Sequence, residues 1–189
     1  LHTTATSHHR ALVVEVMGRH AGWIALHGGM AGGADLILVP EEKFDLEEVC
    51  GQVDRSFAAG VAPIIVASEG AIPTEGSEVT SAEGTDAFGH VRLGGIAGWL
   101  ADRIEERTGH ETRSVVLGHL QRGGTPTAFD RVLATRLGLR AIQAASDGDW
   151  GTMTTLRGTS IELAPLADAV DESKVVPPDR LAEARVFYD

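Results

Sequence analysis

The chain has 189 residues and 43% of them are hydrophobic, so it fits one domain or slightly more and can build a core. Its formal net charge of −11 argues against a nucleic-acid partner, because phosphate contacts need a cationic surface. No apolar run approaches the roughly 20 residues of a membrane span, and no signal peptide opens the chain. Cys50 is the single cysteine, which excludes an intrachain disulfide and fits a reducing setting. We therefore expect a cytoplasmic protein without membrane or nucleic-acid partners.

The first elements alternate between strand and helix. Ala11–Val16 is a short β-branched run that predicts a strand, ended by Gly18. Gly22–Met30 is small and apolar and is expected to be helical. Asp35–Pro40 predicts a second buried strand, which Pro40 stops because proline cannot continue a ladder.

The middle of the chain repeats this alternation. Asp45–Ala59 has apolar residues at helical spacing, and Asp45 is a candidate N-cap. Ala62–Ser68 predicts a third strand. Ala71–Thr85 is rich in Gly, Ser, Thr, Glu and Pro without a period, so we expect an exposed loop.

The later elements complete the pattern. Gly95–Thr108 predicts an amphipathic helix, Ser114–Leu117 a fourth strand and Phe129–Ser146 a long helix, and Val176-Pro177-Pro178 indicates a turn before a short terminal segment. Short hydrophobic strands between helices predict an α/β fold with a mostly parallel sheet and flanking helices.

Polar residues and glycines follow three of the four predicted strands. Met17-Gly18-Arg19 follows the first strand, Glu69-Gly70 the third, and Gly118–Gly124 the fourth. In open parallel sheets, ligands bind at the carboxyl ends of the strands. Arginine donates two hydrogen bonds to one phosphate, glycine lets backbone N–H groups approach an anion, and a glutamate accepts from sugar hydroxyls. These residues together indicate a phosphate or sugar-phosphate site.

Each of these residues also has a purely structural interpretation. Met17 fits a core position, His119 fits a satisfied core histidine, and Arg19 fits a surface ion pair with Glu15 or Glu41. The convergence of all of them on one edge of one sheet favours the binding site.

Two other motifs are rejected as sites. Adjacent His8 and His9 point apart, and no acid or cysteine stands at ligand spacing, so a metal site is not expected. Gly28–Gly33 has the composition of a phosphate loop, but no Lys-Ser or Lys-Thr follows it. Close helix packing is the better interpretation of these glycines.

Two stretches resemble the 6-phosphofructokinases. They are Val14–Arg19 and the long, specific Arg113–Gly124, with Asp130-Arg131 beyond them. The resemblance covers essentially the whole chain and is closest to the branch that includes ATP-using and pyrophosphate-using enzymes. It implies phosphorylation of fructose 6-phosphate at its 1-hydroxyl to fructose 1,6-bisphosphate, a step of glycolysis.

The resemblance also implies a set of substrate-binding residues: Arg10, Met17, Gly18, Arg19, Glu69, Arg113, His119, Leu120, Gln121 and Arg122. In it, Glu69 accepts from the sugar hydroxyls, while His119 and Arg122 hold the sugar phosphate. Arg19 also becomes a candidate transition-state stabiliser. Arg10 and Arg113 reach across an interface into a neighbour's site, which implies a homodimer or homotetramer.

The same resemblance divides the chain. Residues 1–120 become the fructose 6-phosphate domain, 121–155 a returning segment of the donor domain, and 156–189 a C-terminal tail. The family's Gly-rich donor loop, Mg²⁺-binding aspartate and catalytic aspartate precede the region that matches Leu1, so we expect a cut or processed start and no transfer by this chain alone. The helix at Phe129–Ser146 should then expose an apolar face.

Control by an effector and loss of catalysis both remain open at this point. The family's acidic effector residue falls at Asp35, but no basic cluster stands around Ala58–Val61. A non-catalytic sugar-phosphate-binding protein uses the same residues without transfer. A structural or interaction module binds no sugar phosphate at all.

Overall fold

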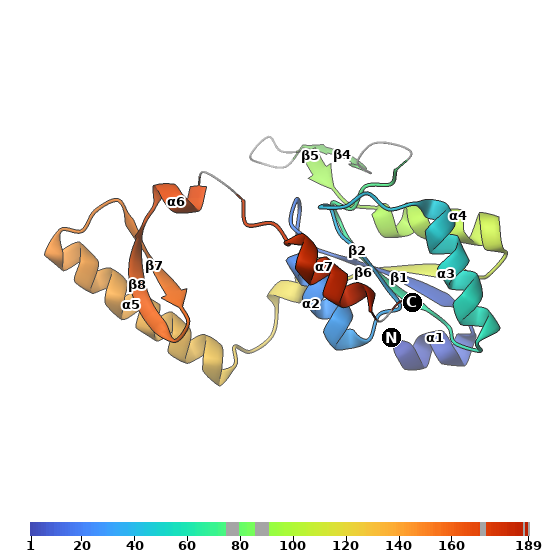
Figure 1. Cartoon of the computed structure of the whole chain (residues 1–189), viewed down its shortest axis with the longest axis horizontal. Helices are drawn as coiled ribbons and strands as arrows, with labels where there is room; N and C mark the ends of the chain where they lie inside the picture. Colours follow the sequence, from blue (N-terminus) through green and yellow to red (C-terminus); the bar gives the residue numbers. More distant parts are fainter. Residues whose placement is uncertain (75–79, 86–90, 171–172, 187, 189) are drawn as a thin grey trace. The chain divides into compact units, whose positions relative to one another are not determined.

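The computed structural model describes residues 1–74, 80–85, 91–170, 173–186 and 188. The chain forms two compact units (Figure 1). The first contains Leu1–Gln121 together with Val175–Asp189, and the second contains Arg122–Lys174. The functional roles expected for residues 1–120, 121–155 and 156–189 stay predictions.

A four-stranded parallel sheet organises the first unit. Its order is β2 (Leu36–Leu38), β3 (Ile64–Ser68), β1 (Ala11–Val16) and β6 (Thr112–Val116). Every residue of β1 and β3 is buried, as expected for central strands of a parallel sheet covered on both faces. The predicted α/β fold is confirmed.

Helices cover both faces of this sheet (Figure 1). Val13 and Ile65 pack with α3 (Leu46–Ala58) and α4 (Ile96–Thr108) on one face. On the other face, Leu12 and Val14 pack with residues of α1 (His2–His8), α2 (Trp23–Gly32) and α7 (Pro178–Arg185). The chain therefore leaves β1 through α2 on one face of the sheet and enters β6 from α4 on the other face. In sheets with helices on both faces, ligand sites lie at the carboxyl ends of the strands.

Two carboxylates fix the starts of α3 and α4. Asp45 accepts a hydrogen bond from the N–H of Glu47, so the predicted N-cap is confirmed. Glu15 lies inside β1 with 5% of its surface exposed, and its carboxylate accepts from the N–H groups of Gly95 and Ala97. A buried charge needs such partners, and the N-terminal end of a helix supplies them.

The second unit is a helix packed with a hairpin. Thr127 and Asp130 form a capping box that starts α5 (Ala128–Asp147). β7 (Thr152–Arg157) and β8 (Ser160–Pro165) pair antiparallel, and α6 (Ala167–Val170) follows them. The sequence predicted the helix but not this hairpin, because its strands mix polar and apolar residues without a clean alternation.

The predicted loop over Ala71–Thr85 was wrong in part. Phe44 pairs with this segment, donating its N–H to Ile72 O and accepting from Thr74 N. Thr80–Thr85 forms β4, antiparallel to β5 (Val91–Leu93), while residues 75–79 lie outside the described residues. Backbone pairing here overrides the low strand propensity of Gly, Ser and Glu.

No helix in the described part of the chain is long and apolar enough to cross a membrane.

The glycines of α2 provide a test of this packing. A Cβ on Gly29 would lie 2.5 Å from Ile37 Cγ1, whereas a Cβ on Gly28 would meet nothing within 4 Å. We expect Gly29→Ala to destabilise the protein by about 1–3 kcal/mol through overpacking. Gly28→Ala should be neutral or stabilising by up to about 1 kcal/mol, since alanine favours helix. Urea unfolding of both variants measures this, and equal effects would contradict the α2–β2 packing.

Candidate functional site

A tight turn carries Met17, Gly18 and Arg19 beyond the end of β1. The N–H of Ala21 donates to Gly18 O at 3.0 Å, and a Cβ on Gly18 would lie 2.5 Å from Ala21 O, so the turn needs glycine. Arg19 has a φ of 50°, in the left-handed region that disfavours side chains other than glycine. Strain of this kind persists where the surroundings enforce it, often at functional sites.

Glu69 fastens this turn to the end of β3. Its Oε1 accepts from the N–H of Gly18 at 3.2 Å and from the N–H of Arg19 at 3.0 Å. The N–H of Glu69 in turn donates to Val16 O at 2.9 Å. Because only Oε1 makes these two bonds, Oε2 stays outside them. Sequence reasoning missed this backbone role of Glu69.

Gln121 fastens the same turn to the segment after β6. Its Oε1 accepts from the N–H of Met17 at 2.8 Å, across 104 positions of the chain. Gln121 belongs to a short 3₁₀ helix, η1 (Gly118–Arg122), which also carries exposed His119 and Leu120. The structure therefore gathers a group that we call the carboxyl-edge site: Met17, Gly18, Arg19, Glu69 and Gln121, with His119 and Leu120 on the same short helix.

The site is packed tightly from beneath. A Cβ on Gly70 would lie 1.8 Å from Arg19 O. The hydroxyl of Ser68 is fully buried without a hydrogen-bond partner and would lie 3.1 Å from a Cβ on Gly18. Gly18 and Gly70 thus let two strand ends approach more closely than side chains would allow.

Arg122 belongs to the second unit, which begins at that residue. The two units are described separately, so a contact between Arg122 and the carboxyl-edge site stays a prediction.

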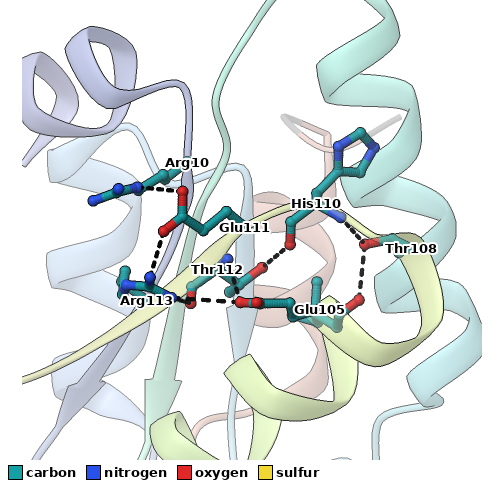
Figure 2. A network of polar contacts seen from close by, with 8 residues as sticks. Arg10, Glu105, Thr108, His110, Glu111, Thr112 and Arg113 are labelled. Atoms are coloured by element: carbon teal, nitrogen blue, oxygen red, sulfur yellow. Dashed lines mark hydrogen bonds and ion pairs between the residues drawn. The ribbon is translucent and has the colours of Figure 1, made fainter.

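Arg10 and Arg113 lie at the opposite, amino edge of the sheet. The six residues of β1 lie between Arg10 and Met17, so the two are separated by roughly 23 Å, at about 3.3 Å for each step along the strand. Both guanidinium groups contact Glu111, with Arg10 Nε at 2.6 Å from Glu111 Oε2 (Figure 2). The Arg10 guanidinium beside Glu111 is the main cause that lowers the pKa of the Glu111 carboxyl below its ordinary value.

No metal cluster marks the carboxyl-edge site among the residues that the structure describes. Within the described ranges, no group of three or more His, Cys, Asp or Glu side chains is placed to hold a metal ion. A cavity of about 830 Å³ lies beside β2, lined by residues of α3 and α7, and none of the expected substrate residues lines it. Asp35, the expected effector residue, accepts a hydrogen bond from the N–H of Ile64 at 2.8 Å, which is a structural contact.

The chain is similar to curated sugar-phosphate phosphotransferases. It is 63% identical over 188 residues to the pyrophosphate–fructose 6-phosphate 1-phosphotransferase of Amycolatopsis methanolica, covering 100% of this chain and 55% of the relative. It is 52% identical over 189 residues to the ATP-dependent 6-phosphofructokinase of Mycobacterium bovis, again covering 100% of this chain and 55% of the relative. The chain therefore spans about half the length of the relatives it matches.

Solved structures agree with this likeness. The pyrophosphate-dependent phosphofructokinase of Nitrosospira multiformis has a TM-score of 0.77 and 26% identity, covering 94% of this chain and 45% of that one. Residues 1–145 match the phosphofructokinase family. An α/β fold with this match over most of its length defines the class, and the chain belongs to the phosphofructokinase family.

Gly70 offers a direct test of the carboxyl-edge site. We expect Gly70→Ala to displace the Met17–Arg19 turn, because the new methyl group would overlap Arg19 O. The variant should lose about 2 kcal/mol or more of stability and its affinity for fructose 6-phosphate should fall at least tenfold. Denaturant unfolding and titration calorimetry measure both effects.

Gly98→Ala is the matched control, since a Cβ on Gly98 in α4 meets nothing within 4 Å. If Gly70→Ala behaves like this control, the close approach of the two strand ends is wrong.

Proposed function

We propose that this chain is the sugar-phosphate-binding half of a phosphofructokinase. The complete protein moves a phosphoryl group from ATP or pyrophosphate to the 1-hydroxyl of fructose 6-phosphate, giving fructose 1,6-bisphosphate in glycolysis. The observation that carries this proposal is the fastening of Met17–Arg19 to Glu69 and Gln121, beside His119, at one edge of a parallel sheet. Membership of the family and relatives acting with either donor support it.

The residues divide the work by chemistry. Arg19 and His119, with Arg122, supply hydrogen-bond donors for the sugar phosphate and for negative charge that develops during transfer. Glu69 has one carboxylate oxygen engaged with the turn, so its Oε2 is the atom that accepts from a sugar hydroxyl. Phosphoryl transfer depends mostly on such positioning and charge stabilisation.

Arg10 and Arg113 act on a second copy of the chain in this proposal. Arg10 lies roughly 23 Å along β1 from Met17, and Arg113, which pairs with Leu12, lies level with a point roughly 16 Å from Met17. Both distances exceed the reach of an arginine side chain. A sugar phosphate that both arginines touch therefore belongs to a neighbour. A homodimer or homotetramer with shared sites satisfies this geometry.

The donor, Mg²⁺ and the catalytic aspartate belong to the other half of the complete protein. Mg²⁺ would neutralise charge on the transferring phosphate, and no described residues form a cluster for it. Phe129, Val132, Leu139 and Ile142 on α5 are 58–73% exposed. An apolar helix face of this kind is normally covered, and the rest of a donor domain would cover it.

A transfer assay tests the proposal against its main alternative. The complete protein from its source is incubated with fructose 6-phosphate and either ATP or pyrophosphate, with Mg²⁺, and fructose 1,6-bisphosphate is measured. Product with one donor supports the phosphotransferase and identifies that donor. Binding of fructose 6-phosphate without product from either donor would instead support the non-catalytic binding protein.

Arg122 has the sharpest predicted effect on binding. Removing a charged hydrogen bond to phosphate in Arg122→Ala should weaken fructose 6-phosphate binding by about 1.5–3 kcal/mol, or roughly 10- to 150-fold. Arg157→Ala is the control, because Arg157 is an exposed arginine on β7 of the same unit, 3.8 Å from Glu162. Calorimetry measures both dissociation constants. An Arg122→Ala value equal to that of the control counts against this role for Arg122.

A further inference from the structure

We propose that Glu111 is a positioning residue that joins Arg10 and Arg113 into a single anion-binding pair. The anion is the phosphate of fructose 6-phosphate bound to a second copy of the chain. This inference rests on the proposed function and adds a residue to it, because neither the sequence motifs nor the expected substrate residues include Glu111.

The carboxylate of Glu111 lies between the two guanidinium groups (Figure 2). Its Oε2 is 2.6 Å from Arg10 Nε, and its Oε1 accepts from Arg113 Nη2. The parallel register produces this arrangement. Ala11 pairs with Thr112 and Leu12 with Arg113, so Arg10 enters β1 directly beside Glu111. Glu111 directly precedes β6, and its side chain contacts that of Arg113 two positions later.

Separate elements hold the two arginines. The N–H of Arg10 donates to Ala5 O in α1. On the other side, Glu105 of α4 accepts from Thr112 N at 3.1 Å and from Arg113 Nη1 at 3.5 Å (Figure 2). Glu111 is thus the side chain that links the α1 side of this edge to the α4 side.

The magnitudes favour positioning over stabilisation. The side chains of Arg10 and Glu111 are 35% and 39% exposed, and ion pairs of such exposure contribute little to stability. Two guanidinium groups this close repel each other unless a negative charge lies between them. The carboxylate offsets that repulsion. The contact with Glu111 is made through Arg10 Nε, and a guanidinium group has further N–H donors that a phosphate can meet.

Loss of the Glu111 charge should therefore separate the arginines and weaken substrate binding. In the complete protein, Glu111→Gln should raise the dissociation constant and KM for fructose 6-phosphate about tenfold, while kcat falls less than twofold. In an Arg10→Ala background, the same change should add less than about twofold, because the pair is already broken. Calorimetry and steady-state kinetics give these values.

Glu106→Gln is the matched control. Glu106 forms an exposed ion pair with Arg103 on α4, 2.5 Å long, that takes no part in the proposed pair. It should leave the dissociation constant, KM and kcat as in the unchanged protein.

The outcomes separate this inference from the proposed function. If the unchanged protein does not bind fructose 6-phosphate, the proposed function fails and this inference fails with it. If it binds, and Glu111→Gln binds equally well or more tightly, only the inference is overturned, and tighter binding would mean that Glu111 competes with phosphate. Fully independent effects of Glu111→Gln and Arg10→Ala, or a loss of kcat as large as the rise in KM, would also overturn it.

Discussion

The parallel pairing of β1 between β3 and β6 is the constraint on which both ends of the first unit depend. At its carboxyl end, β1 presents Met17–Arg19 between Glu69 and Gln121. At its amino end, it presents Arg10 beside Glu111. A slip of one residue would turn every side chain of β1 to the opposite face and take the Glu15 carboxylate away from the start of α4, so the register that builds one end also fixes the other.

Arginines lie at specific places within an acidic chain, and carboxylates bind groups near them. The chain carries a net charge of −11, yet arginines stand at both ends of β1. Several carboxylates bind backbone or arginine groups instead of facing solvent alone. Glu15 fixes the start of α4, Glu69 fixes the Met17–Arg19 turn, and Glu111 binds two guanidinium groups. Glu69 thus holds the backbone of Arg19, and Glu111 holds the guanidinium groups of Arg10 and Arg113. Arginines held in this way can donate to a phosphate.

Much of the fold could be predicted from the sequence, because its strands are short β-branched runs and α3 and α4 have helical spacing. The residues of the carboxyl edge could be named for the same reason, since they follow strand ends. The partners of Glu69, Gln121 and Glu111 could not be predicted, because each depends on register between segments about 50 to 104 positions apart. Glu111 directly precedes β6 and Arg113 lies in it, but only the pairing of β1 with β6 brings Arg10 beside them. The β7–β8 hairpin was missed because neither strand has a clear alternation of polar and apolar residues.

A crystal structure of the complete protein with fructose 6-phosphate tests the central claim most directly. The account predicts a sugar phosphate at the carboxyl ends of β1, β3 and β6 of one copy, in contact with Arg19 and His119. It also predicts that Arg10 and Arg113 of a second copy lie within hydrogen-bond distance of the same phosphate. A sugar phosphate bound elsewhere, or one surrounded by residues of a single copy, would contradict the account.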